Sequence, residues 1–197
     1  MRITGGQAKG RRLLGPKASQ HMLRPTCGRV REALFNIIGN ERICGAMVLD
    51  LFAGTGVWGI EALSRGAAAA LFVDKSPAAG RLIAANLRNC LPQAQAGFVR
   101  LHLHAASQLS SLGEKIPPPH CFDLVFLDPP YQKNLAEQLL KVVEEAHILA
   151  PSALVVTEEH HCTVLPARIG ALQSMDRRRY GESALWLFTL NAQPTGM

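Results

Sequence analysis

The fold of this chain is decided by the stretch Asp50-Leu51-Phe52-Ala53-Gly54-Thr55-Gly56-Val57-Trp58-Gly59. An apolar run over residues 46–51 leads into it and predicts a buried strand, while residues 60–65 continue as a helix that ends at Gly66. The three glycines match G-x-G-x-x-G, a loop that joins a strand to a helix where nucleoside cofactors bind. The stretch therefore predicts the first strand, loop and helix of an α/β fold.

The same alternation continues along the chain. We expect further strands at residues 69–74, 98–103, 122–127 and 153–157, and helices at residues 77–90, 106–112 and 135–147. Such alternation predicts a parallel sheet with helices on both faces. Residues 172–178 and 184–190 flank a tight turn and predict an antiparallel hairpin at one edge. The expected fold is therefore α/β and Rossmann-like, with a seven-stranded, mostly parallel sheet and an antiparallel C-terminal hairpin.

Length and composition describe one globular domain, in which 48% of the 197 residues are hydrophobic. No apolar stretch reaches the ~18 residues of a membrane span, and the N-terminus lacks the apolar core of a signal peptide. The cysteines lie at positions 27, 44, 90, 121 and 162 and never form a Cys-x-x-Cys pair. We therefore expect reduced thiols in a cytoplasmic protein that does not bind a membrane.

Charge is concentrated in the first 31 residues, which contain eight Lys or Arg and no Asp or Glu. A basic arm of this kind suits a polyphosphate backbone, where each neutralised phosphate releases a counterion. A solubilising tail is the alternative, but Ile3 and Leu13 are interleaved with the charges and favour an arm that docks on the body. The expected RNA contacts are Lys9, Arg11, Arg12, Arg24, Arg29 and Arg31.

The arm leads into an expected helix that starts after Thr26, its N-cap, and ends near Ile38. Arg29 and Arg31 are interpreted as lying on faces of this helix that are free to meet a partner. On the expected helix over residues 77–90, Asn86 and Asn89 are interpreted as surface residues.

Two carboxylates near the glycine loop bear on the choice of cofactor. Asp74 lies 18 residues beyond Gly56, at the end of the second expected strand, from which a carboxylate binds ribose hydroxyls. The loop alone leaves both NAD and S-adenosylmethionine open. Asp50, just before the loop, would repel the pyrophosphate of NAD but attract the ammonium group of S-adenosylmethionine. The carboxylate therefore favours S-adenosylmethionine.

A second motif, Asp128-Pro129-Pro130-Tyr131, follows the apolar strand expected at residues 122–127. The carboxylate can accept a hydrogen bond from an exocyclic amine, and a carbonyl of the ring-locked proline backbone can accept another. The tyrosine ring can stack on a flat base. The tetrad predicts a site that methylates the amino group of a nucleobase.

Two groups of histidines could suggest a metal site, but the sequence does not favour one. His102 and His104 lie two positions apart, as residues on one face of a strand do, and His160, His161 and Cys162 are consecutive. No carboxylate or further cysteine stands at ligand spacing from them, so no metal site is expected.

With both motifs placed, the chain resembles the class I S-adenosylmethionine-dependent methyltransferases. More narrowly, it resembles the bacterial family that methylates the exocyclic N2 of a guanine in small-subunit (16S) ribosomal RNA. The tetrad is shared with DNA adenine methyltransferases, whereas the arm is more specific to the ribosomal RNA family. The residues that carry the resemblance are Arg2-Ile3-Thr4-Gly5-Gly6, Gly10-Arg11-Arg12-Leu13, Leu23-Arg24-Pro25-Thr26, Arg29 to Asn36, Leu49 to Gly56, Gly59 to Gly66 and the tetrad at Asp128.

The resemblance implies the roles of individual residues. The catalytic set would be Asp128, Pro129, Pro130 and Tyr131. The S-adenosylmethionine contacts would be Asp50, Phe52, Ala53, Gly54, Thr55, Gly56, Asp74, Lys75, His104, Ala105 and Asp128. The chain departs from the family pattern at two positions. His104 occupies the position where many relatives place an acid or amide against the adenine. Asp74 stands where Glu is frequent. Residues 1–40 would form an RNA-contacting arm and helix, and residues 41–197 the catalytic domain.

The expected partner is small-subunit ribosomal RNA or an assembled ribosomal subunit, bound by a monomer. A DNA adenine-N6 methyltransferase is the main alternative, although 197 residues leave little room for a separate recognition region. An NAD-dependent oxidoreductase would need a proton-relay motif such as Tyr-x-x-x-Lys, which the chain lacks. A non-catalytic RNA-binding module is disfavoured by the intact set of Asp50, Gly54, Gly56, Asp74 and Asp128.

Overall fold

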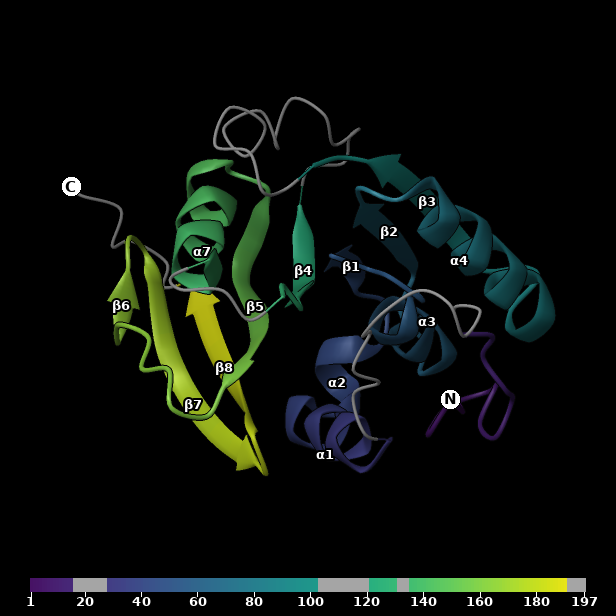
Figure 1. The fold of residues 1–197 in the computed structure, drawn as a ribbon, viewed down its shortest axis with the longest axis horizontal. Coiled ribbons are helices and arrows are strands. Elements are labelled where there is room, and N and C mark those ends of the chain that lie inside the picture. The colour runs from purple at the N-terminus through teal and green to yellow at the C-terminus, as the bar shows by residue number, and fades with distance from the viewer. Residues whose placement is uncertain (16–27, 103–120, 131–134, 191–197) are drawn as a thin grey trace. The chain divides into compact units, whose positions relative to one another are not determined.

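The computed structural model describes residues 1–15, 28–102, 121–130 and 135–190 (Figure 1). The chain forms two compact units, Met1–Leu101 and His102–Met197. None of the helices in the described ranges is long and apolar enough to cross a membrane. The predicted helix over residues 106–112 and the predicted N-cap Thr26 lie outside the described residues.

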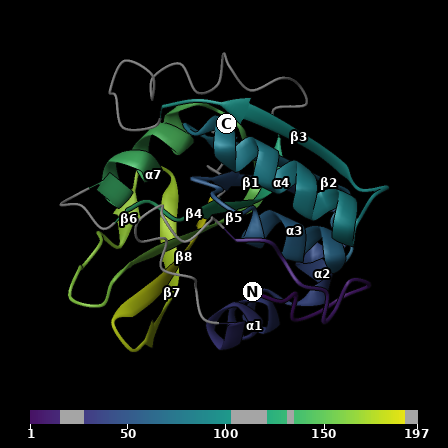
Figure 2. The ribbon, with the colours of Figure 1, turned by 45° about the vertical axis from the view of Figure 1, so that its right-hand side comes forward.

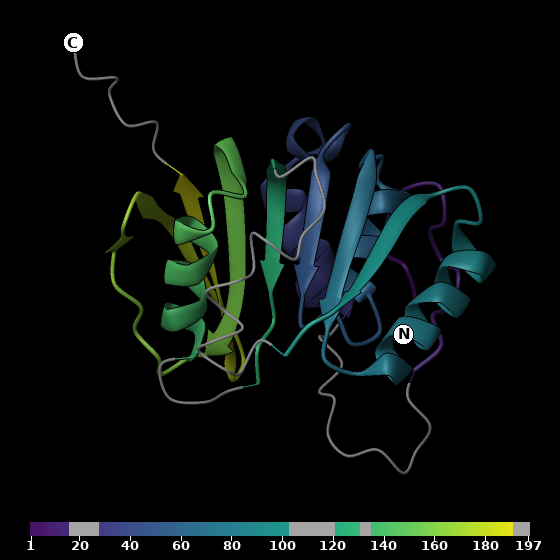
Figure 3. The ribbon, with the colours of Figure 1, turned by 90° about the horizontal axis from the view of Figure 1, so that it is seen from above.

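The first unit contains a parallel sheet of three strands in the order β3-β2-β1. The strands are β1 (Met47–Leu51), β2 (Ala69–Asp74) and β3 (Gln95–Arg100), and Figure 3 shows them side by side. Helix α3 (Val57–Ser64) connects β1 to β2, and α4 (Pro77–Cys90) connects β2 to β3. The short helices α1 (Gly28–Ile38) and α2 (Asn40–Ile43) precede β1.

Local sequence explains these crossovers. In β1, Val48, Leu49 and Leu51 are completely buried, as expected of a strand covered on both faces. Ser76 caps the N-terminus of α4, where its side chain accepts a hydrogen bond from the Ala78 N–H, and Pro77 begins the first turn. The sequence-based boundaries of β2 and α4 are therefore confirmed.

The second unit contains five strands in the order β4-β5-β8-β7-β6. Strands β4 (Phe122–Leu127) and β5 (Leu149–His160) are parallel and are linked through α7 (Leu135–Glu145). The remaining strands are antiparallel: β6 (Arg168–Ile169), β7 (Leu172–Tyr180) and β8 (Ser183–Leu190). The buried face of α7 is formed by Leu135, Ala136, Leu139, Leu140 and Val143. The antiparallel hairpin predicted at the C-terminal end is confirmed.

Three strand predictions are wrong in detail. Strand β3 covers Gln95–Arg100 rather than residues 98–103, because its side chains are largely exposed and show no apolar alternation that would fix its limits. Strand β5 extends beyond residues 153–157 at both ends, and its polar end is held by pairing with β8. The two-residue β6 was not predicted, so the described residues hold eight strands rather than seven.

Candidate active site

The glycine loop turns the chain sharply between β1 and α3. Phe52, Gly54 and Gly56 all have positive φ angles, of 61°, 52° and 74°. A Cβ atom on Gly56 would lie 2.9 Å from the Ile83 side chain, so both its backbone and its surroundings require glycine. Helix α3 begins at Val57, so Gly59 lies in its first turn, where a Cβ would collide with the ring of Phe72. The third glycine therefore packs the helix against β2, whereas Gly54 and Gly56 shape the loop.

Two carboxylates hold this loop in place. Asp50 is completely buried, and its Oδ2 accepts a hydrogen bond of 3.0 Å from the Gly59 N–H in the first turn of α3. Asp74 is half-buried at the end of β2, and its Oδ2 accepts a bond of 2.9 Å from the Gly54 N–H. The other oxygen of Asp74 accepts from the Ser76 N–H at 2.8 Å. Asp74 therefore orders the tip of the loop from the neighbouring strand, and each of its oxygens keeps lone-pair capacity for a ligand hydroxyl.

The remaining predicted cofactor contacts fall into different environments. Ala53 is buried and donates its N–H to the Val73 carbonyl, and Thr55 is also buried. Phe52 is half-buried and Lys75 is exposed. His104 and Ala105 lie outside the described residues. The structure thus brings the glycine loop, Asp50 and Asp74 together within the first unit.

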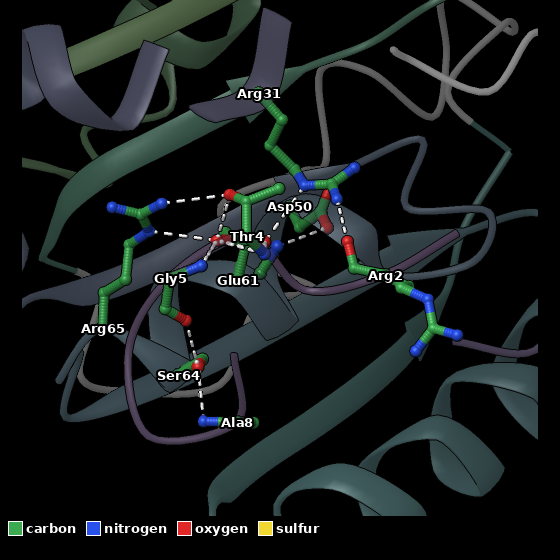
Figure 4. Close-up of polar contacts among 10 residues, drawn as sticks. Arg2, Thr4, Gly5, Ala8, Arg31, Asp50, Glu61, Ser64 and Arg65 are labelled. Atoms are coloured by element: carbon green, nitrogen blue, oxygen red, sulfur yellow. Dashed lines mark hydrogen bonds and ion pairs between the residues drawn. The ribbon is translucent and has the colours of Figure 1, made fainter. Parts of the chain in front are cut away.

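The N-terminal arm is fixed to α3 by hydrogen bonds to Glu61 and Ser64 (Figure 4). Glu61 is completely buried and accepts hydrogen bonds from the Thr4 N–H at 2.9 Å, the Thr4 hydroxyl at 2.7 Å and the Gly5 N–H at 2.7 Å. One turn later, Ser64 accepts from the Ala8 N–H at 3.0 Å and donates to the Gly5 carbonyl at 2.6 Å. The arm therefore packs on the helix that follows the glycine loop (Figure 2).

Two arginines pair with the same carboxylate. Arg31 Nε lies 3.1 Å from Glu61 Oε2, and Arg65 Nε lies 3.0 Å from Glu61 Oε1. Arg31 also donates through Nη2 to the carbonyl of Arg2 (Figure 4). The prediction that Arg31 contacts RNA is therefore wrong, because its side chain is only 1% exposed. It occupies the buried face of α1 at helical spacing from Leu34 and Ile38.

The rest of the arm presents its charges to solvent while burying its apolar residues. Ile3, Ala8 and Leu13 are at most 2% exposed, which confirms a docked arm rather than a loose tail. Beneath it, burial raises the pKa of the Cys90 thiol, with a smaller opposing effect from the Arg11 charge.

The exposed basic residues of the described arm and α1 are Arg2, Lys9, Arg11, Arg12 and Arg29. Arg24 lies outside the described residues.

Asn86 connects the arm to the glycine loop. Its Oδ1 accepts a hydrogen bond of 2.7 Å from the Leu14 N–H, and its Nδ2 donates to the carbonyls of Leu14 at 3.2 Å and Thr55 at 3.1 Å. The surface interpretation of Asn86 is wrong, because the residue is completely buried. Its spacing from Ile83 and Cys90, both buried on α4, was the signal that could have placed it on the inner face.

The second motif lies in the second unit, directly after β4. Leu124 to Leu127 are buried, and the register pairs Leu127 with Thr157 of β5. Asp128 follows at the carboxyl end of the strand and is half-buried, Pro129 is buried and Pro130 is exposed. Tyr131 lies outside the described residues. The position of the carboxylate at a strand end, as the sequence predicts, is therefore confirmed.

The buried carboxylate Glu61 gives a stability prediction. Glu61→Gln removes the negative charge and leaves the buried guanidinium of Arg31 without its ion pair, so the free energy of unfolding should fall by about 3–5 kcal/mol. Glu32→Gln, an exposed change on α1, is the matched control and should leave stability within about 0.5 kcal/mol. Urea unfolding followed by circular dichroism measures both, and equal stabilities would contradict the role given to Glu61.

Asn86 gives a prediction for cofactor affinity. Asn86→Asp places a carboxylate against the Leu14 and Thr55 carbonyls and removes both donors, which should weaken S-adenosylmethionine binding about tenfold, since an unmatched buried polar group costs ~1–3 kcal/mol. Asn89→Asp, an exposed change one turn later, makes the same chemical substitution without touching the loop. Calorimetric titration of the folded variants compares them, and equal affinities would show that Thr55 is held without Asn86.

Comparison with known proteins places the chain in a family. The family model described as conserved hypothetical protein 95 matches residues 1–189. The chain is 37% identical over 195 residues to ribosomal RNA small subunit methyltransferase D of Escherichia coli, covering 98% of this chain and 91% of the relative. A protein of the same name from Haemophilus influenzae is 37% identical over 158 residues, which cover 80% of this chain and 78% of the relative.

Solved structures agree with this relationship. A methyltransferase structure from Escherichia coli superposes with a TM-score of 0.81 at 34% identity, covering 98% of this chain and 99% of that one. A more distant methyltransferase, solved in complex with SAH, has a TM-score of 0.62 at 17% identity and covers 82% of this chain and 48% of its own, so it supports the fold alone. The fold is the α/β fold of the class I methyltransferases, a mixed and mostly parallel sheet with antiparallel C-terminal strands. The chain belongs to the ribosomal RNA small subunit methyltransferase D family.

Proposed function

We propose that this protein transfers a methyl group from S-adenosylmethionine to the exocyclic N2 of a guanine in small-subunit ribosomal RNA. The observation that carries the proposal is the nearly full-length relationship to ribosomal RNA small subunit methyltransferase D of Escherichia coli. The glycine loop of the first unit and Asp128-Pro129-Pro130 of the second unit supply the two kinds of residue that this chemistry needs.

The residues of the first unit suit the proposed cofactor. A Cβ on Gly54 would meet nothing closer than the Phe52 carbonyl at 3.8 Å, so the backbone is open on that side. Asp74, bonded to the Gly54 N–H, would accept hydrogen bonds from the ribose hydroxyls. Asp50 would supply negative charge near the ammonium group from its position behind the loop. The bound cofactor supplies an electrophilic methyl group on a sulfonium.

Asp128 and Pro129 would activate the acceptor nitrogen. The lone pair of a guanine amine is delocalised into the ring, which makes the nitrogen a poor nucleophile. The Asp128 carboxylate and the Pro129 carbonyl would accept the two amine hydrogens and favour a tetrahedral nitrogen with an aligned lone pair. The carboxylate would also stabilise the positive charge that develops on nitrogen. Orientation would supply most of the remaining rate, and Tyr131 would stack on the base.

The arm would bind the RNA backbone. Its exposed cations, among them Lys9, Arg11 and Arg12, suit phosphate contacts, and Arg29 adds one on α1. The functional division would be residues 1–40 for RNA contact and residues 41–197 for catalysis. We further propose that the protein acts as a monomer on an assembled or assembling subunit in the cytoplasm.

The proposed catalytic carboxylate is tested by Asp128→Asn. This variant should lose nearly all methyl transfer to small-subunit ribosomal RNA while binding S-adenosylmethionine almost normally, because only the amine acceptor has changed. Asp123→Asn is the matched control, since Asp123 is an exposed carboxylate on the same strand. Single-turnover transfer of labelled methyl measures both variants. Normal turnover by Asp128→Asn would remove Asp128 from the mechanism.

The proposed phosphate contacts are tested by the salt dependence of RNA binding. Lys9→Gln should make the slope of log affinity against log salt less steep by roughly 0.7–0.9, the amount expected for one lost phosphate contact. Lys141→Gln removes an exposed charge from α7 and should leave the slope unchanged. An unchanged slope in Lys9→Gln would exclude Lys9 from the RNA interface.

A further inference from the structure

The end of β5 carries a group of side chains that methyl transfer does not use. His160 is the last residue of β5, and His161 and Cys162 follow it in a turn. Strand β5 pairs antiparallel with β8, so that His160 stands opposite Ser183. The preceding residue, Glu182, lies in the turn between β7 and β8 and accepts a backbone hydrogen bond of 2.9 Å from the His161 N–H. The fold therefore brings Glu182 beside three potential metal ligands.

The three side chains converge on one point. One ligand atom each from His160, His161 and Cys162 lie within 4.8 Å of one another. Cys162 Sγ is 3.3 Å from His161 Nε2. Nitrogen and sulfur ligands of a tetrahedral zinc ion lie about 3.5 Å apart, as follows from the usual bond lengths. The cluster therefore needs only small side-chain movements to close around an ion.

Glu182 offers a hydrogen-bond acceptor to one nitrogen of each ring. His160 Nε2 lies 3.3 Å from Glu182 Oε2, and His161 Nδ1 lies 3.3 Å from the Glu182 carbonyl. Both partners are acceptors, so they favour the tautomers in which these two ring nitrogens carry the proton. The lone pairs are then left on His160 Nδ1 and His161 Nε2, the two nitrogens that face Cys162. Such outer carboxylate and carbonyl partners are typical of metal-bound histidines.

The charges around the cluster permit a cation. Glu182 and Glu159 contribute carboxylates, and Glu159 accepts from the His160 N–H at 3.0 Å. Arg177 opposes them, since its guanidinium stacks over Trp186 and donates to the His161 carbonyl. Cys162 is exposed, so an ion can reach the thiol from solvent.

We propose that His160 Nδ1, His161 Nε2 and Cys162 Sγ form a binding site for a borderline-soft divalent cation such as Zn²⁺. A thiolate with two imidazoles favours Zn²⁺ over Mg²⁺ or Ca²⁺, which prefer oxygen ligands. Water completes the tetrahedron, and the weak bond from the Cys162 N–H to His160 Nδ1, at 3.3 Å, is replaced by the metal. The ion ties the turn after β5 to the β7–β8 turn through Glu182. Sequence spacing does not point to this site, because Glu182 lies 22 positions after His160 and only the fold brings the two together.

Cobalt titration tests the site, because Co²⁺ reports its ligands by absorption. The full chain, reduced and without an affinity tag, should gain tetrahedral visible bands and a thiolate-to-cobalt charge-transfer band, both of which Zn²⁺ abolishes. Cys162→Ser should lose the charge-transfer band, whereas Cys121→Ser, a change at an exposed cysteine outside the cluster, should keep it. Absence of the band in the unaltered chain, or its persistence in Cys162→Ser, would overturn the proposal.

The role of Glu182 is tested separately. Glu182→Ala should weaken Zn²⁺ binding by about 10–100-fold, the usual effect of removing an outer partner of a ligating histidine. Glu145→Ala, an exposed change on α7, should have no effect. Equal zinc affinities in the two variants would refute the tautomer argument. Both measurements are made without RNA, so they stand whether or not the proposed methyl transfer is correct.

Discussion

The buried carboxylate of Glu61 is the interaction on which the first unit depends. It receives two backbone N–H groups and a hydroxyl from the arm, and it pairs with guanidinium groups from α1 and from its own helix. Buried charges are tolerated only when such partners surround them. Because Glu61 lies on α3, directly after the glycine loop, the arm and the loop are built on the same helix. The backbone of the described arm, which carries Lys9, Arg11 and Arg12, is therefore anchored to the helix that follows the proposed cofactor loop.

The glycine loop is ordered by its own backbone bond from the Gly56 N–H to the Ala53 carbonyl and by side chains from neighbouring elements. Asp74 bonds its tip from β2, Asn86 bonds the Thr55 carbonyl from α4, and Asp50 bonds the first turn of the helix beyond it. Each contact comes from a different element of the same unit. A loop held in this way loses little entropy when a ligand binds, which favours affinity through preorganisation. Asn86 extends the arrangement to Leu14, so the end of the described arm and the loop share one side chain.

Most elements of the fold were predictable because their apolar residues follow helical or strand spacing. The strand, loop and helix around Gly54, and the strand before Asp128, match the structure for this reason. Strand β3 was misplaced because an exposed strand lacks that pattern. Local sequence places Arg31 and Asn86 on the surface because their side chains are polar. Both are buried because distant partners satisfy their hydrogen bonds, and local sequence does not reveal such partners. Those partners, Glu61 and Leu14, lie 30 and 72 positions away. The roles of Arg24, His104, Ala105 and Tyr131 stay predictions, since these residues lie outside the described ranges.

The atom that receives the methyl group distinguishes the proposed function from its main alternative. The most direct measurement is to incubate the protein with labelled S-adenosylmethionine and unmethylated small ribosomal subunits, digest the RNA and identify the labelled nucleoside by chromatography and mass spectrometry. The expected product is N2-methylguanosine at a single site. Label recovered as N6-methyladenosine would contradict the proposed function, as would label that enters duplex DNA but not the ribosomal RNA.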